Sequence, residues 1–324
     1  MLVSIIITAR DEDPRILQAT LEGLHATTRH IATDVIVIDD GSTKAVVPEG
    51  AFRERRVRLL RNPDPLGVCE SRRTGALLAR GEWMVWLDAH MNFGEGWLEQ
   101  MLVQSNPGSV VCSPFWSYDF QTCMCWGADF AWVPTRNYHE GKYPGFAVRH
   151  RTEKPETAAA EVPMVIGACY AMDRETYDAL GGFCPHFRVW GIDEQDLSAR
   201  AWMAGVRVVC ATHAQVGHYV RQSFPYPVQF EHLEFNQAVM FRSVFEQATI
   251  KRLEGYFEPP PVVESWLAAT DLTEWRKSVQ RRRKMNDAEF FARFIPELAD
   301  ELPPKTPRAG KTPAKRRAGK ARSE

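Results

Sequence analysis

The sequence predicts an α/β fold in which helices cover both faces of a mixed, mostly parallel sheet. Short apolar runs rich in Val and Ile recur between Val3 and Ala211, and such runs are typical of strands buried on both faces. Segments with apolar residues at helical spacing separate several of these runs. Because alternating strands and helices indicate a doubly wound sheet, we expect ligands to bind at the carboxyl ends of its strands.

The first half of the chain follows this alternation. Strands are expected where β-branched residues form a continuous run, and helices where apolar residues recur every three or four positions. These patterns predict strands at 3–8, 34–40, 57–62, 83–91 and 109–117, and helices at 15–26, 67–80 and 96–102.

The pattern changes after Ser117. The segment 126–134 is expected to form a hairpin strand, and 134–161, rich in charged and turn-forming residues, a long surface loop. A strand followed by a helix is predicted within 162–183, with Asp173 as the helix cap. The remaining predictions are a helix at 193–204, a strand at 206–211, a helix at 234–245 and helical structure at 263–302.

The composition, with 44% hydrophobic and 25% charged residues, is that of an ordinary soluble globular protein. No stretch approaches the ~20 apolar residues needed to cross a bilayer, so no membrane anchor is expected. The amino terminus lacks the basic leader and cleavage site of a signal peptide. The seven cysteines suit reduced thiols better than a disulfide framework. We therefore expect a cytoplasmic protein.

Residues 303–324 form a basic tail. They contain eight Lys or Arg and one Glu, although the whole chain has a net charge of -1. With almost nothing large to bury, the tail cannot offset the entropy cost of ordering and is expected to be disordered. Two roles stay open for it: a solvated extension, or a tether to nucleic acid or another anionic surface, since clustered cations bind phosphates.

Acidic residues mark the ends of two predicted strands. Asp39 and Asp40 close one of them, where a carboxylate either binds a nucleobase or ribose or caps the backbone of the turn. Asp88 and His90 end another, and in an extended segment side chains two residues apart point to the same side. A mixed oxygen and nitrogen site of this kind suits a divalent ion such as Mn²⁺, which can also hold diphosphate oxygens. The alternative is a surface Asp followed by a structural His.

Further motifs follow in the second half of the chain. Trp190 and Gly191, in an acidic turn, are followed by a helix and a strand that lead to Gly217-His218 and Arg221. With the Asp-x-His element, this segment resembles the catalytic domain of polypeptide N-acetylgalactosaminyltransferases and related sugar transferases. The order and spacing of the motifs carry the resemblance, which runs from Val3 to about Phe245. It implies a GT-A fold, which is a Rossmann-like mixed sheet flanked by helices.

The resemblance also implies a metal site. Asp88, His90 and His218 would bind Mn²⁺, or another divalent ion such as Mg²⁺, and the ion would bridge the two phosphates of a UDP-sugar. Arg221, three residues after the last of these ligands, would neutralise the diphosphate.

Four other residues correspond to positions that surround the donor in this family. Asp40 would contact the uridine, and Arg72 aligns with an arginine on the nucleotide side. Trp190 matches a Trp-Gly turn beneath the sugar and the acceptor. Tyr226 lies in a segment that resembles a mobile lid, which would close over the nucleotide.

The chain departs from the family at the acidic turn. The family's Trp-Gly-Gly-Glu-Asn is here Trp190-Gly191-Ile192-Asp193-Glu194. In a retaining enzyme the acid would position donor and acceptor, whereas in an inverting enzyme Asp193 or Glu194 would deprotonate the acceptor hydroxyl as a general base. The neighbouring GIDEQDL also resembles an element of the inverting family-two glycosyltransferases. The stereochemical outcome therefore stays open, with retention favoured.

These observations predict three parts: a GT-A catalytic domain at 1–248, a helical extension at 249–302 and the tail at 303–324. The predicted function is metal-dependent transfer of a hexose or N-acetylhexosamine from a UDP-sugar to a hydroxyl, with a protein Ser or Thr as the family-based acceptor. The alternatives are an inverting enzyme that acts on DNA bases, cell-wall material or a small molecule, and a non-catalytic nucleotide-sugar-binding protein.

Overall fold

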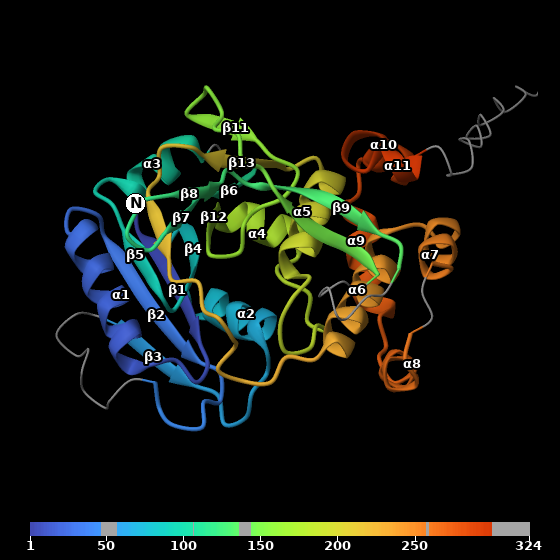
Figure 1. Cartoon of the computed structure of the whole chain (residues 1–324), viewed down its shortest axis with the longest axis horizontal. Helices are drawn as coiled ribbons and strands as arrows, with labels where there is room; N and C mark the ends of the chain where they lie inside the picture. Colours follow the sequence, from blue (N-terminus) through green and yellow to red (C-terminus); the bar gives the residue numbers. More distant parts are fainter. Residues whose placement is uncertain (47–56, 106, 136–143, 257–258, 300–324) are drawn as a thin grey trace, which may run out of the picture.

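The computed structural model describes residues 1–46, 57–105, 107–135, 144–256 and 259–299. An eight-stranded sheet lies at its centre and confirms the predicted α/β class (Figure 1). Four of the seven strand pairings are parallel, and β11 and β12 run antiparallel to their neighbours. In spatial order the strands are β11 (Ala159–Glu161), β13 (Arg207–Ala211), β6 (Ser109–Cys112), β12 (Cys169–Asp173), β4 (Trp83–Asp88), β1 (Val3–Ala9), β2 (Thr33–Asp39) and β3 (Val57–Arg61).

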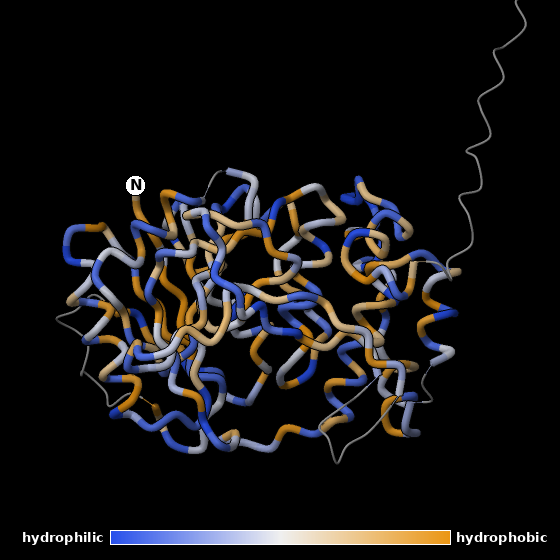
Figure 2. Tube along the Cα trace, turned by 45° about the horizontal axis from the view of Figure 1, so that its top comes forward, coloured by the Kyte–Doolittle hydropathy of each residue, from blue (hydrophilic) through white to orange (hydrophobic). Residues whose placement is uncertain are grey.

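Helices cover both faces of this sheet because successive side chains of each strand point to opposite sides. Ile5 and Ile7 of β1 belong to a core cluster shared with α1 (Pro14–Thr27) and α3 (Trp97–Gln104). Ile6 belongs to the cluster on the other face, which includes residues of α2 (Val68–Leu78), α4 (Arg174–Leu180), α5 (Asp193–Ala204) and α6 (Phe230–Val244). Figure 2 shows hydrophobic segments gathered along the strands of the sheet.

Local signals fix where two of the predicted helices begin. The Asp13 side chain accepts a hydrogen bond from the Arg15 N–H at 2.9 Å, and Pro14 occupies the first turn of α1. Asp173 accepts from the Thr176 N–H at 2.7 Å and caps α4, as predicted. The helix predicted at 193–204 is confirmed in both its bounds as α5.

Two strands predicted as single elements are each divided between two sheets. The segment 83–91 becomes β4 and β5 (Met91–Phe93), and 109–117 becomes β6 and β7 (Phe115–Ser117). In each case the first part joins the central sheet, whereas the second part joins a four-stranded sheet in the order β5, β14 (Val216–His218), β7 and β8 (Cys123–Cys125). Apolarity alone could not indicate this change, because the second part of each segment is apolar too, with Met91 and Phe93 in β5 and Phe115 and Trp116 in β7.

The prediction of a surface loop throughout 134–161 is wrong. β10 (Gly145–His150) pairs along its whole length with β9 (Ala128–Val133), and β11 extends the central sheet. Phe146 of β10 is fully buried, while the charged end of the strand is exposed. Because only one end of β10 is buried, its sequence lacks the continuous apolar run that predicts a strand, and the charged residues favoured a loop instead. Residues 136–143 lie outside the described residues.

The predicted helical extension is confirmed over the residues that the structure describes, and it lies at the right of Figure 1. Trp275 and Phe290 belong to the same core cluster as residues of α5 and α6, so the extension shares a hydrophobic core with these helices. The boundary at residue 248 stays a prediction. The tail at 303–324 lies outside the described residues. The helices are α7 (Gln247–Glu254), α8 (Pro261–Ala268), α9 (Thr273–Arg282), α10 (Asp287–Phe294) and α11 (Pro296–Ala299).

Side chains of α9 also donate hydrogen bonds to the backbone carbonyls at the end of α6. Arg276 Nη1 donates to the Phe245 carbonyl at 2.9 Å, and Gln280 Nε2 donates to the Ser243 and Val244 carbonyls at 2.9 Å each. The last carbonyls of a helix have no partner within the helix itself, so these bonds fix α6 against the extension. Among the described helices, none is long and apolar enough to span a membrane.

Candidate functional site

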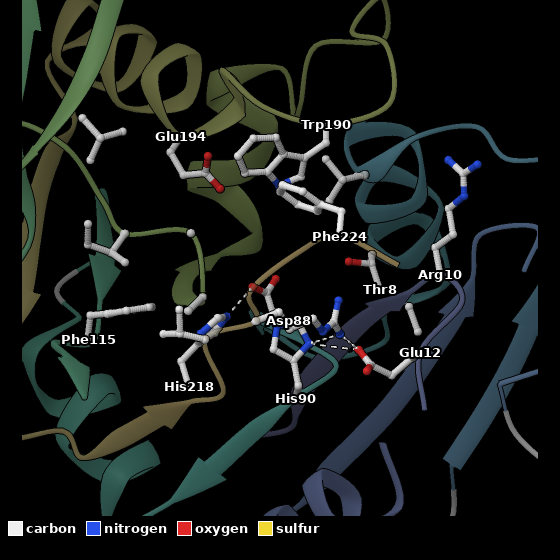
Figure 3. A pocket seen from close by; sticks show the side chains of 18 of the residues that line it. Thr8, Arg10, Glu12, Asp88, His90, Phe115, Trp190, Glu194, His218 and Phe224 are labelled. Carbon is white, nitrogen blue, oxygen red and sulfur yellow. Dashed lines mark hydrogen bonds and ion pairs between the residues drawn. The ribbon is translucent and has the colours of Figure 1, made fainter. Parts of the chain in front are cut away.

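A cavity of about 530 Å³ lies at the carboxyl ends of β1 and β4, the edge of the sheet where ligands are expected. Figure 3 shows Trp190 and Glu194 on the side of this cavity that faces Asp88 and His90. Asp40 and Asp193 are buried and do not line this cavity. Eight of the predicted site residues line the cavity: Arg72, Asp88, His90, Trp190, Glu194, His218, Arg221 and Tyr226.

Asp88, His90 and His218 come together as predicted, and we call them the metal cluster. One ligand atom from each lies within 4.8 Å of the others, and His218 Nε2 is 3.2 Å from Asp88 Oδ2. His218 reaches the site because β14 pairs with β5, which follows Asp88 and His90 in the chain. The expectation that Asp88 and His90 lie in one extended strand is wrong, because Asp88 ends β4 and His90 lies in the bend before β5.

The donor set of the metal cluster fits a divalent cation. Two atoms bound to one ion at roughly 2.0–2.2 Å are at most about 4.4 Å apart, so small shifts would bring all three ligands onto one ion. Burial alone would raise the pKa of Asp88, but the hydrogen bond with His218 and the nearby histidines and Arg72 outweigh it and lower that pKa. His218 Nδ1 is buried and has no partner among the described residues. A ligand at this cluster would meet an ionised carboxylate and two imidazoles.

Glu12, which the sequence analysis missed, lies beside this cluster in the loop after β1. Its side chain is 3% exposed, and one carboxylate oxygen is 2.9 Å from His90 Nδ1. The same oxygen contacts the guanidinium of Arg221, whose Nη2 is also 2.7 Å from His90 Nδ1. Carboxylates in this position orient a ligating histidine. A single Glu in the loop ARDED carried no signal of a partner 209 positions away.

Arg72 links the metal cluster to the acidic turn. Its side chain is 4% exposed and contacts Asp193, which is 1% exposed. The guanidinium also lies 3.4 Å from Glu194 Oε1 and 3.6 Å from Asp88 Oδ1. Burial opposes the charge, but Tyr170 and these carboxylates raise the pKa of Arg72 above its ordinary value. The predicted nucleotide contact stays a prediction, while the three carboxylates give Arg72 a bridging role.

Asp193 and Glu194 are adjacent but occupy different environments. Asp193 is buried against Arg72, whereas Glu194 lines the cavity with a side chain that is 16% exposed. Burial, followed by repulsion from Asp193, raises the pKa of Glu194 to about 8. Gly167 leaves room for this side chain, since a Cβ there would collide with the Glu194 carboxylate. Of the two acids, only Glu194 is placed to contact a ligand in the cavity.

Three aromatic rings line the cavity and contact one another in sequence; we call them the aromatic wall. The ring of Trp190 lies 4.8 Å from that of Phe224, which in turn lies 5.9 Å from the ring of Tyr226. Arg10 stacks over Tyr226 at 4.5 Å. Burial raises the pKa of Tyr226 to about 12, so its hydroxyl keeps its proton at neutral pH. Phe224 and Arg10 were not among the predicted site residues, although Phe224 lies in the predicted lid segment.

Asp40 uses its carboxylate within the protein. Oδ1 accepts from Asn62 Nδ2 at 3.0 Å, from the Leu66 N–H at 2.8 Å and from the Ser71 hydroxyl at 2.8 Å, while Oδ2 accepts from the Gly67 N–H at 2.9 Å. These bonds fold the loop between β3 and α2. They favour the turn-capping role that the sequence left open, and the uridine contact stays a prediction.

Comparisons with known proteins give two matches to family models and several relatives. The model of glycosyl transferase family 2 matches residues 4–181, and a model described as the N-terminal domain of galactosyltransferase matches 150–223. Polypeptide N-acetylgalactosaminyltransferase 11 of Xenopus tropicalis is 28% identical over 245 residues, which cover 69% of this chain and 39% of that protein. Polypeptide N-acetylgalactosaminyltransferase 15 of Homo sapiens is 27% identical over 327 residues, with 94% and 48% coverage. The chain thus spans less than half the length of these relatives.

Comparison with solved structures finds a similar fold. The crystal structure of GalNAc-T7 with UDP, GalNAc and Mn²⁺ matches with a TM-score of 0.71 and 18% identity, over 94% of this chain and 58% of that chain. This likeness confirms the predicted GT-A fold, and the relatives confirm the predicted resemblance to polypeptide N-acetylgalactosaminyltransferases. Since the first family model covers more than half of the sequence, the chain belongs to glycosyl transferase family 2.

Proposed function

We propose that this chain is a metal-dependent glycosyltransferase that moves a hexose or N-acetylhexosamine from a UDP-sugar to a hydroxyl. One observation carries the proposal: a single cavity brings the metal cluster and Arg221 to one side and Glu194 and Trp190 to the facing side. Family membership supports the reaction class. The GalNAc-T7 crystal, which holds UDP, GalNAc and Mn²⁺, supports the choice of donor and ion.

The donor's diphosphate would lie at the metal cluster. A divalent ion bound there supplies Lewis acidity and positive charge that stabilise a departing UDP. Asp88, His90 and His218 would hold it, with Glu12 fixing the ring of His90 through the contact at Nδ1. Arg221 adds a guanidinium on the same side, where preorganised charge lowers the barrier to leaving-group departure.

The acceptor hydroxyl would lie near Glu194. We favour retention of the anomeric configuration, because the relatives are polypeptide N-acetylgalactosaminyltransferases and the sequence resemblance links that family with a positioning acid. Inversion is the second candidate. It is favoured by the pKa of Glu194, since a value of about 8 lies close to the working range of a general base. The names of the relatives make a Ser or Thr hydroxyl of a polypeptide the proposed acceptor.

The test is a screen of UDP-sugars for released UDP, with Mn²⁺ and then with excess EDTA. We expect one or a few sugars to be turned over and EDTA to abolish turnover. His218→Ala should remove the Mn²⁺-stimulated activity and weaken Mn²⁺ binding, whereas His213→Ala, which changes an exposed histidine between β13 and β14, should affect neither. Absence of turnover with every donor would overturn the proposal and favour a nucleotide-sugar-binding protein. The anomeric configuration of the product, read by NMR, decides between retention and inversion.

A further inference from the structure

The Trp190 turn, which comprises residues 188–192, has an unusual backbone. Val189, Gly191 and Ile192 have φ angles of 50°, 93° and 71°, all in the left-handed region. Val and Ile rarely adopt this region, because a branched Cβ crowds the backbone there. Strained backbone of this kind persists only where the surrounding structure determines it. The turn carries Trp190 and leads into Glu194, so something outside the turn must fix both side chains.

Asn236, in the middle of α6, supplies that restraint. Its side chain is fully buried, and Oδ1 accepts from the Arg188 N–H at 2.8 Å. Nδ2 donates to the carbonyls of Arg188 at 2.9 Å, Gly191 at 3.0 Å and Trp190 at 3.3 Å. Both ends of one amide are therefore bonded to the main chain of the turn, on either side of Trp190.

Two further contacts hold the turn from opposite sides. The Val68 N–H, at the start of α2, donates to the Val189 carbonyl at 2.9 Å. Leu233, one turn before Asn236 on α6, packs so closely on Gly191 that a Cβ at Gly191 would collide with it. The turn is therefore clamped between α2, which carries Arg72, and α6.

We propose that Asn236 is a positioning residue for glycosyl transfer, acting through Trp190 and Glu194. This inference rests on the proposed function. Asn236 does not line the cavity, so its effect on the reaction is indirect. α6 also follows the segment with Phe224, whose ring contacts Trp190. The helix that holds the turn therefore also follows the segment that carries Phe224.

The neighbouring residue provides a matched control. Gln237 is equally buried on α6, and its Oε1 accepts from the Phe146 N–H at 3.0 Å, on β10. Asn236→Ala and Gln237→Ala each remove a buried amide that binds main chain. They differ in which segment is released: the Trp190 turn in the first variant and β10 in the second.

Steady-state kinetics are measured first. Asn236→Ala should lower kcat by about 100-fold, the size expected when reacting groups shift by about 1 Å, with little change in the KM for the UDP-sugar or in the affinity for UDP and Mn²⁺. Gln237→Ala should also lose stability, because it removes a buried hydrogen bond to main chain, but should keep its kcat. Equal loss of kcat in both variants, or loss of UDP affinity in parallel with kcat in Asn236→Ala, would overturn the positioning role.

Hydrogen exchange gives a second measurement that needs no activity. Asn236→Ala should accelerate exchange in peptides that contain Arg188, and Gln237→Ala in peptides that contain Phe146. Unchanged exchange at Arg188 would refute the restraint even if activity fell. If Asn236→Ala does not fold, Val189→Asn should restore folding in the double variant, because Asn tolerates the left-handed region; failure to do so would also count against the restraint. A wild-type protein that turns over no UDP-sugar would show the proposed function itself to be wrong, while the hydrogen-exchange result would still test whether Asn236 restrains the turn.

Discussion

Replacing Arg72 with Met tests whether one buried guanidinium joins the two sides of the site. Arg72 is 4% exposed and its closest partner, Asp193, is 1% exposed, so neither group is compensated by water. Methionine has a similar length and no charge. The substitution therefore leaves Asp193 buried without a cation, while Asp88 and Glu194 each lose a neighbouring positive charge.

The size of the effect follows from this burial. Removing one partner of a buried ion pair typically costs about 3–5 kcal/mol. The entropy of unfolding is roughly 2.1 cal/mol/K per residue, or about 0.7 kcal/mol/K for 324 residues, so each kcal/mol lowers the midpoint of thermal unfolding by about 1.5 °C. The Arg72→Met variant should therefore lose about 4–7 °C. Adding Asp193→Asn should recover much of that loss, because no ionised Asp193 then remains without a partner.

The assay is urea and thermal unfolding at pH 7 of both single variants and the double variant. Arg149→Met is the control, because Arg149 is 64% exposed and pairs with Asp129 at the surface, where an ion pair contributes about 0–1 kcal/mol. The reasoning is refuted if Arg72→Met costs no more than the control. It is also refuted if the effects of Arg72→Met and Asp193→Asn simply add.

Three other predictions concern the loop held by Asp40, the titration of Glu194 and the basic tail. Asp40→Asn replaces one of the two carboxylate oxygens, which together accept four hydrogen bonds, with an NH₂ group that cannot accept, so it should lower the free energy of unfolding by about 1–3 kcal/mol; wild-type stability in urea would contradict the capping role. Folding raises the pKa of Glu194 from 4.5 to about 8, so its ionised form disfavours the folded state, and stability should decline as the pH rises between these values. The free energy of unfolding, measured against pH, should decline less in Glu194→Gln than in the wild type. Identical profiles of the two proteins would exclude a contribution from the titration of Glu194. Removal of residues 303–324 should leave the affinity for UDP-sugar unchanged in titration calorimetry, and a large loss would place the tail in the donor site.

The sequence predicted the fold well where burial is continuous. The β-branched run of β1 and the apolar spacing of α1 predict these elements correctly, because local composition and tertiary environment agree there. It failed where the environment changes within one apolar run. The bend at His90 moves the chain from one sheet to another, and nothing local distinguishes β4 from β5. β10 was missed because only one end of it is buried.

The same distinction applies to the site. The metal cluster was predictable because its ligand types are rare together and their order follows a known family. Glu12, Asn236 and the bridging role of Arg72 were not, because each depends on a partner brought close only by the fold. No local sequence pattern distinguishes such an acid, amide or arginine from a polar side chain that is merely exposed to solvent.

The charges around the cavity explain why a diphosphate would bind together with a cation. Among the described residues, Arg72 contacts Asp88 and Asp193, and Arg221 contacts Glu12, while Arg10 lines the cavity and stacks on Tyr226. A diphosphate alone would add two negative charges beside these acids, where Arg72 and Arg221 are already paired and Coulomb repulsion is poorly screened. A divalent ion at the metal cluster would cancel the added charge without drawing Arg72 or Arg221 away from their partners. Metal and donor should therefore stabilise one another, and the donor's sugar would then extend toward Glu194 and the turn that Asn236 holds.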